Sequence, residues 1–157
     1  MSSITPFLWF DDQAEQAAAF YVSIFPNSKI ITTSYYGDNM PAPAGTAMVV
    51  DFELNGQRFN ALNGGPALTF SPAISFVINC ENQAEIDHYW QNLSADPASE
   101  QCGWLKDKFG LSWQVIPSML GKLMGDPDSA KSARVMAAML SMKKIILADL
   151  EKAYHQT

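Results

Sequence analysis

The side chains that could do chemistry in this chain are few, and their spacing matches no common catalytic or metal-binding motif. There is no Cys-x-x-Cys, His-Glu-x-x-His, phosphate-binding loop or Gly-x-Gly-x-x-Gly pattern. Cys102 is a candidate nucleophile, but the histidines of the chain are His88 and His155, and neither is placed to activate that thiol. A structural role for Cys102 is therefore favoured, and the usual motifs assign no function.

The most informative stretch is 102–117, which reads Cys-Gly-Trp-Leu-Lys-Asp-Lys-Phe-Gly-Leu-Ser-Trp-Gln-Val-Ile-Pro. It predicts two short strands joined by a tight Lys-Phe-Gly turn, where glycine supplies the positive φ that such a turn needs. In the second strand, Leu111, Trp113 and Val115 share one face. Gln114 then lies on the other face. This amide points either to solvent or into a ligand cavity, and the choice between them bears on function.

Composition predicts one soluble domain with its own core, since the chain has 157 residues and 48% apolar content. The net charge of −6 argues against nucleic acid or an anionic membrane as a partner. No signal-peptide pattern and no apolar run of about 20 residues is present, so a cytoplasmic protein is expected. Two cysteines in a domain of this size indicate reduced thiols.

The elements that must position these residues follow one order twice: a strand, a helix and then three strands. Shifting the chain by 69 residues aligns Phe7-Leu8 with Phe76-Val77, and shifting its later part by 54 aligns Phe59-Asn60 with Trp113-Gln114. Modules of about 1–66 and 72–117 are therefore predicted, with an Asn-Gly hairpin turn at 55–56 in the first. Side by side, they would form an α+β fold, in which a cupped, mixed and largely antiparallel sheet carries its helices outside.

Two segments leave alternatives open. The loop at 37–45, rich in proline and glycine, is either a surface connection or a lid over a pocket. The tail, about 118–157, predicts a short apolar helix and then a longer one capped by Asp126, with an interruption at Ile145-Ile146. An apolar stripe in this tail belongs either to the core or to a subunit interface; it consists of Val135, Met136, Met139, Leu140 and Met142.

The repeated βαβββ order resembles the vicinal oxygen chelate superfamily, which contains glyoxalase, bleomycin-resistance and extradiol dioxygenase proteins. Within it, the chain resembles the PhnB-like branch, often labelled 3-demethylubiquinone-9 3-methyltransferase-like. The segments that carry this resemblance are 4–10, 20–26, 87–90, 102–117 and 134–140. A homodimer is expected from the resemblance.

Enzymes of this superfamily hold a divalent metal with His and Glu side chains from four strands, two in each repeat. Carried over by motif, these positions are Pro6 and Asn60 in the first module, and Ser75 and Gln114 in the second. Proline has no ligand atom in its side chain, and neutral amides and hydroxyls bind transition metals weakly. We therefore expect no metal site and no cofactor.

Without a metal, the resemblance implies a cup whose floor presents Asn60, Ser75 and Gln114 as neutral hydrogen-bonding groups. Its walls would come from Trp9, Phe59, Trp104 and the loop at 36–45, a lining that suits a small, partly apolar or aromatic ligand. In the alternative, Asn60 and Gln114 only satisfy each other and nearby backbone, and side chains fill the cup.

Three hypotheses about function follow. The favoured one is a metal-free small-molecule-binding protein, akin to the bleomycin-resistance members. The second is a metal-dependent lyase, isomerase or dioxygenase-type enzyme, or the methyltransferase of the branch label; the Gly-rich turn that commonly binds S-adenosylmethionine is missing. The third is a dimeric structural or regulatory module. Whether the chain catalyses a reaction is left open.

Overall fold

The computed structural model describes residues 1–156 and has the α+β organisation that the sequence predicts. The chain divides into two compact units, one from Met1 to Phe70 and one that begins at Ser71. No helix within the described residues is both long and apolar enough to cross a lipid bilayer.

The first unit has the predicted βαβββ order. Its elements are β1 (Phe7–Phe10), α1 (Ala14–Ile24), β2 (Lys29–Tyr35), β3 (Ala47–Leu54) and β4 (Gln57–Asn63). The strands form one mixed sheet in the order β1-β4-β3-β2, in which β1 pairs with β4 in parallel and the other pairs are antiparallel. The predicted hairpin between β3 and β4 is confirmed, with Asn55 and Gly56 both at positive φ.

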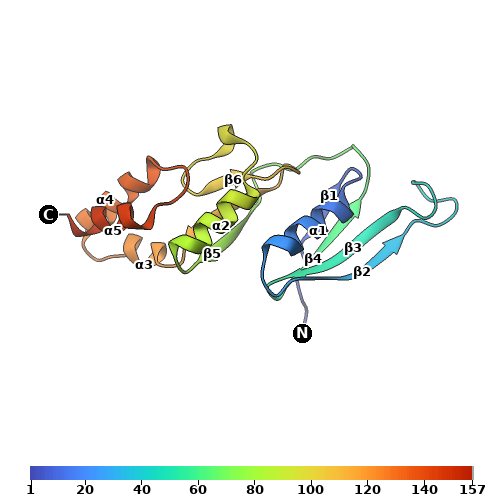
Figure 1. Ribbon diagram of the computed structural model, residues 1–157, viewed down its shortest axis with the longest axis horizontal. Helices are drawn as coiled ribbons and strands as arrows, with labels where there is room; N and C mark the ends of the chain where they lie inside the picture. The colour runs from blue at the N-terminus through green and yellow to red at the C-terminus, as the bar shows by residue number, and fades with distance from the viewer. Residues whose placement is uncertain (157) are drawn as a thin grey trace. The chain divides into compact units, whose positions relative to one another are not determined.

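Helix α1 covers one face of this sheet (Figure 1). It buries an apolar stripe of Ala14, Ala17, Ala18, Tyr21 and Ile24. The small alanines allow the helix to approach the sheet closely, and the Tyr21 ring stacks on Phe52 of β3 with centroids 6.3 Å apart. Burial of this stripe fixes which face of each strand points to the core.

The second unit starts with β5 (Ser75–Cys80), α2 (Gln83–Leu93) and a short 3-10 helix (Pro97–Ser99). Strands β6 (Trp104–Lys106) and β7 (Ser112–Pro117) follow, and the sheet order is β5-β7-β6. The prediction of three strands after the helix is therefore wrong for this unit, because the counterpart of β2 is missing. Its place in the sequence holds the 3-10 helix, which Pro97 opens and Asp96 caps by accepting from the Ala98 N–H.

A helical extension completes the second unit. It consists of α3 (Leu120–Met124), α4 (Ser129–Leu140) and α5 (Leu147–His155). Buried Val135, Ile145 and Leu150 form its core. The backbone N–H groups of Cys102 and Gly103, just before β6, donate to the carbonyls of Met142 and Lys143, each over 2.8 Å. The extension is thus bonded directly to the start of a sheet strand.

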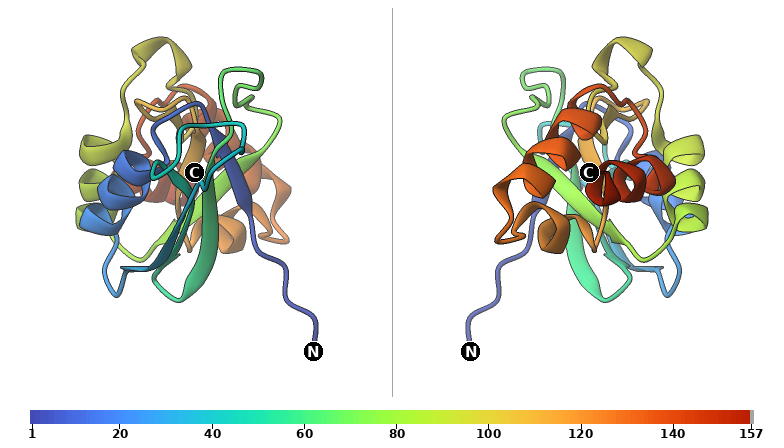
Figure 2. Two further views of the ribbon diagram at one scale, coloured as in Figure 1. Left: turned by 90° about the vertical axis from the view of Figure 1, so that its right-hand side faces the viewer. Right: turned by 90° about the vertical axis from the view of Figure 1, so that its left-hand side faces the viewer.

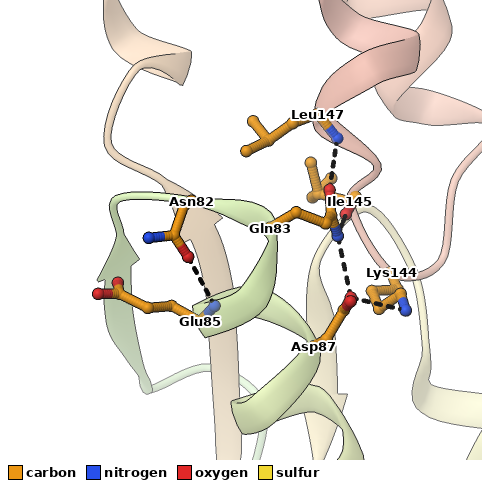
Figure 3. A network of polar contacts seen from close by, with 7 residues as sticks. All are labelled: Asn82, Gln83, Glu85, Asp87, Lys144, Ile145 and Leu147. Carbon is orange, nitrogen blue, oxygen red and sulfur yellow. Dashed lines mark hydrogen bonds and ion pairs between the residues drawn. The ribbon is translucent and has the colours of Figure 1, made fainter.

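Gln83 joins α2 to the extension (Figure 3). Its Oε1 accepts from the Leu147 N–H over 2.8 Å, and its Nε2 donates to the Ile145 carbonyl over 3.1 Å and to Asp87 Oδ1 over 3.0 Å. Asp87 also pairs with Lys144 over 2.8 Å, and the hydrogen bonds from Lys144 and then Gln83 lower the pKa of its carboxyl. Gln83 therefore caps the start of α5, where Ile146 offers no side-chain acceptor.

The cap of α4 differs from the predicted one. Asp128, not Asp126, accepts from the Ala130 N–H, so the helix begins two residues later than Pro127 suggests. Asp126 instead accepts from the Asp128 N–H and from the Tyr154 hydroxyl, which ties the start of α4 to α5. The predicted interruption at Ile145-Ile146 is confirmed, since α5 starts at Leu147.

Candidate functional site

The sheet of the first unit has one face turned away from α1, which we call the open face of the first unit. Side chains alternate along a strand, so Phe7, Asn60 and Asp51, which are paired across β1, β4 and β3, share this face. Asn60 is half-buried, whereas the side chain of Phe7 is 57% exposed. Pro6 precedes β1, and its carbonyl accepts from the Asn60 N–H over 2.9 Å. Pro6 therefore contacts Asn60 through its backbone carbonyl and offers no side-chain hydrogen bond.

Phe59 does not belong to this face. It is buried, faces α1 and stacks on Phe52 with ring centroids 5.4 Å apart. Phe59 and Asn60 are neighbours on one strand, and neighbouring side chains point to opposite faces. The expectation that both line the same cavity is therefore corrected, and Phe59 belongs to the core.

Sequence reasoning missed an ion pair beside Asn60. Arg58 of β4 pairs with Asp51 of β3, and both are on the open face of the first unit. The two-residue spacing of Arg58 and Asn60 is enough to predict that both side chains lie on one face of β4. That Asp51 of β3 is the partner of Arg58 depends on the register between the two strands, which the sequence does not reveal. The open face of the first unit therefore offers a carboxylate and a guanidinium beside the neutral amide.

In the second unit, the open face is the one turned away from α2, and it brings together three predicted site residues. Gln114 Nε2 donates to Ser75 Oγ over 2.9 Å, and Trp104 lies directly across from Gln114 on β6. All three are half-buried. The other face of β7 carries Trp113 and Val115, which are buried as the alternation predicts. Gln114 thus has its hydrogen-bond partner inside its own unit.

The two repeats are offset by one residue from the predicted alignment. Asn60 lies across from Phe7, whereas Gln114 lies across from Val77. Pro6 and Ser75 therefore do not occupy equivalent positions in the two repeats. The Ser75 side chain hydrogen-bonds to the Gln114 side chain, whereas Pro6 hydrogen-bonds to the Asn60 N–H through its backbone carbonyl.

Trp9 is held in one orientation on the open face of the first unit. Its indole N–H donates to the Gly65 carbonyl over 2.9 Å. A Cβ atom on Gly64 would lie only 2.4 Å from Trp9 Cε2, so the ring passes directly over a residue that has to be glycine. The indole is half-buried, and these two contacts fix its orientation.

The loop at 37–45 lines a separate pocket of about 480 Å³ in the first unit. Its wall includes Pro41 and Pro43 of the loop, Tyr35 at the end of β2, and the carboxylates of Asp11 and Glu15 near the start of α1. Asn60 is not part of this lining. Within the first unit, the loop and Asn60 therefore belong to different surfaces.

The positions that the resemblance assigns to the superfamily's metal ligands hold a proline, two amides and a hydroxyl. This donor set does not fit a transition metal, which prefers imidazole and carboxylate. Within residues 1–156, no group of three His, Cys, Asp or Glu side chains is arranged to hold a metal ion. We therefore derive no chemistry through a metal.

The two cysteines differ in accessibility. Cys80 is buried, and burial, followed by the charges of Glu85 and Glu81, raises the pKa of its thiol to about 12. Cys102 is partly exposed and its Sγ accepts from Gln101 Nε2 over 3.2 Å. Cys80 is thus a neutral thiol of the core, and Cys102 is the more accessible of the two.

One reactive thiol per folded chain is expected at pH 8 with Ellman's reagent. Cys102 should react, while Cys80 should react only after unfolding, because its thiol stays protonated up to a pH of about 12. An unfolded chain releases this proton near pH 9.0, so the burial of Cys80 also lowers folding stability as the pH rises from 9.0 to about 12. The Cys102→Ser variant is the control and should leave no fast-reacting thiol; two fast thiols in the native chain would contradict the assignment.

The chain is similar to a known protein family and to solved structures that share its fold. The model of the family described as 3-demethylubiquinone-9 3-methyltransferase matches residues 2–116. The PhnB protein from Bacillus cereus is 38% identical over 74% of this chain and 99% of its own, with a TM-score of 0.63. Protein PA1353 from Pseudomonas aeruginosa is 19% identical over 74% of this chain and 98% of its own, with a TM-score of 0.58.

A glyoxylase/bleomycin resistance protein/dioxygenase domain from Frankia is also similar, at 11% identity over 74% of this chain and 92% of its own, with a TM-score of 0.47. No curated protein matches the chain. The family match ends at Ile116, so α3, α4 and α5 lie beyond it. The chain therefore belongs to the family described as 3-demethylubiquinone-9 3-methyltransferase, and it is PhnB-like.

Proposed function

We propose that this chain is a metal-free small-molecule-binding protein. The observation that carries the proposal is the hydrogen bond between Gln114 and Ser75. At the positions where the superfamily's enzymes place metal ligands, the second unit has a neutral amide paired with a hydroxyl. Such a pair can orient a ligand by hydrogen bonds, but it cannot replace imidazole and carboxylate at a transition metal.

The open faces supply the other contacts. In the second unit, the side-chain amide oxygen of Gln114 and the Ser75 hydroxyl can form hydrogen bonds with a polar group of a ligand. The adjacent Trp104 indole can stack on an apolar ring of the same ligand. In the first unit, we assign the same roles to Asn60 and Trp9. This chemistry suits a small ligand that is partly aromatic and carries neutral hydrogen-bonding groups.

The enzyme alternatives find less support. A lyase, isomerase or dioxygenase-type reaction of the superfamily would require a metal, and the donor set does not fit one. The family's name refers to a methyltransferase, but neither β1 nor β5 is followed by the Gly-rich turn that commonly binds S-adenosylmethionine.

We further propose a cytoplasmic location, since composition and charge suit a soluble protein without nucleic-acid or membrane partners.

The ligand test starts with untagged protein. Native mass spectrometry of the purified chain would identify a co-purified ligand, and a panel of neutral heteroaromatic compounds, screened by saturation-transfer NMR, would supply a probe. We expect Gln114→Ala to weaken binding of the best probe about 10-fold, since a single ligand hydrogen bond is lost. Gln91→Ala is the matched control, because Gln91 is exposed on α2 and should leave binding unchanged.

Two outcomes would overturn the proposal. Near-stoichiometric zinc, manganese or iron in the untagged protein would restore a metal-dependent mechanism. Loss of probe binding in Tyr35→Ala, with Gln114→Ala unaffected, would place the ligand in the loop pocket of the first unit instead.

A further inference from the structure

The loop at 37–45 joins β2 to β3 beyond the ends of both strands, and Figure 2 (left) looks onto it. Together with the start of α1 and the end of β4, this loop lines the cavity of about 480 Å³ in the first unit, which we call the loop pocket. Its volume is typical of cavities that hold small molecules. The function proposed for the open faces makes no use of the loop pocket, because Asn60 is not part of its lining.

Hydrogen bonds tie the walls of the loop pocket together. Asn63, at the end of β4, accepts from the Ala14 N–H at the start of α1 over 2.8 Å and donates to the Ala47 carbonyl over 3.1 Å. The Tyr36 hydroxyl donates to the Asn63 carbonyl over 2.5 Å. The loop closes on itself through the Gly45 N–H, which donates to the Tyr36 carbonyl over 2.8 Å. The cavity is therefore preformed, so ligand binding would cost little free energy for ordering the protein.

One side of the loop pocket is acidic. Asp11, Asp12 and Glu15 contribute carboxylates near the start of α1, and we call these three residues the acidic wall. No Lys, Arg or His is among the described residues that line the pocket. Because charges of one sign in a concave site attract ligands of the opposite sign, the acidic wall favours a cation.

The basic side chains of the first unit lie far from the acidic wall. Residues 1–70 contain Lys29 and Arg58 as their basic residues. Lys29 begins β2, whereas Tyr35 at the other end of β2 lines the pocket, and the seven residues of this strand span about 20 Å. Arg58 is near the start of β4 and pairs with Asp51. The first unit therefore supplies no basic side chain to neutralise the acidic wall.

The other side of the loop pocket suits an organic molecule. Pro41 and Pro43 come from the loop, and the Tyr35 side chain is 56% exposed. Within residues 1–156, no three His, Cys, Asp or Glu side chains are arranged to hold a metal ion, so the three carboxylates do not converge on one point. Their charge is spread along the wall, which suits a planar, delocalised cation better than a metal ion.

We propose that the loop pocket binds a small organic cation. Its amidinium or guanidinium group faces the acidic wall, and its planar apolar body lies against Tyr35 and the prolines of the loop. The pocket also adjoins the support of Trp9, because Gly65 is part of the lining and its carbonyl accepts the Trp9 indole N–H over 2.9 Å. Binding should therefore change the environment of that N–H.

The test is an NMR titration of the isotope-labelled full chain with three probes of matched shape: cationic benzamidine, neutral benzamide and anionic benzoate. We expect benzamidine to bind with a dissociation constant on the order of 1 mM, as is usual for so small a ligand. Benzamide and benzoate should bind at least about 10-fold more weakly, since they lack the positive charge. Benzamidine should shift the indole N–H signal of Trp9, which is the signal that Trp9→Phe removes.

A double variant locates the site. Asp11→Asn combined with Glu15→Gln should weaken benzamidine binding about 10-fold, because two partly solvated carboxylates are lost. Asp149→Asn combined with Glu151→Gln makes the same change of charge at exposed positions of α5 and should bind like the wild type. Gln114→Ala should also leave benzamidine binding unchanged, which separates this site from the ligand site proposed above.

Circular dichroism must show that the variants keep their secondary structure. Benzamide that binds as tightly as benzamidine would overturn the proposal, since the pocket would then select shape and not charge. Benzamidine binding that the Asp11→Asn and Glu15→Gln changes leave intact, or that does not move the Trp9 signal, would overturn it too, because the cation would bind elsewhere. So would the absence of benzamidine binding at a concentration about 10-fold above the expected dissociation constant.

Discussion

Replacing Asp107 by alanine is expected to lower the free energy of unfolding by about 3–5 kcal/mol, because three donors, two of them buried, lose one acceptor group. Asp107 is only 3% exposed. Its Oδ1 accepts from the N–H groups of Phe109 over 2.9 Å and Leu111 over 3.0 Å, and its Oδ2 accepts from Trp113 Nε1 over 2.9 Å. One carboxylate thus fixes both the turn between β6 and β7 and the largest side chain of β7.

Urea unfolding, followed by tryptophan fluorescence and circular dichroism, would measure this loss. Asp107→Asn is the informative comparison, since it keeps an oxygen for the turn but can set an N–H₂ group against Trp113 Nε1. We expect it to lose less stability than Asp107→Ala. If Asp107→Ala costs less than about 1 kcal/mol, the carboxylate is not an essential support of the hairpin.

Gly103→Ala is expected to cost about 2–5 kcal/mol, the sum of an unfavourable backbone conformation and a steric clash. Gly103 has φ +86°, and a Cβ there would lie 2.7 Å from Ile116 Cδ1 and 3.0 Å from the Val115 carbonyl oxygen. It would also approach Ile145 Cγ1 to 3.2 Å, so the clash would push the extension away from the sheet.

Gly110→Ala separates the two contributions. Gly110 has φ +90°, but no atom lies within 4 Å of the position its Cβ would occupy. It should therefore show only the conformational cost of about 1–2 kcal/mol. The same urea titration measures both variants. Equal losses for Gly103→Ala and Gly110→Ala would show that the packing of the extension against the hairpin tolerates an added methyl group.

Local patterns predicted much of the fold. The Asn55-Gly56 turn and the alternation of Trp113 and Val115 with Gln114 depend on neighbouring residues, and each is present in the structure. The missing strand of the second unit could not be seen in this way. Its segment has strand length, but Pro97 directs it into a 3-10 helix, and only the final sheet order reveals the absence.

The sequence predicted the candidate site only in part, because the face on which a strand residue lies depends on strand register. Phe59 and Pro6 are the residues for which this mattered. The site needs the correct face at every strand, and a slip of one residue moves a side chain to the opposite face. The resemblance predicts that Ser75, Gln114 and Trp104 lie together, and in the structure Gln114 bonds to Ser75 and lies across from Trp104. β1 has aromatic residues on both of its faces, so its sequence pattern does not show which face points to the core. It therefore could not show that Phe7, rather than Pro6, lies across from Asn60.

The bonds that Gln83 makes with Ile145 and Leu147 span 62 and 64 residues of the chain. Gln83 is synthesised long before those partners exist, and so are the N–H groups of Cys102 and Gly103 that bond to Met142 and Lys143. The first unit, in contrast, contains all its strand partners by Asn63. On the ribosome, the first unit can therefore fold while the second is still being made, and the second unit can close only when the last helix has left the exit tunnel.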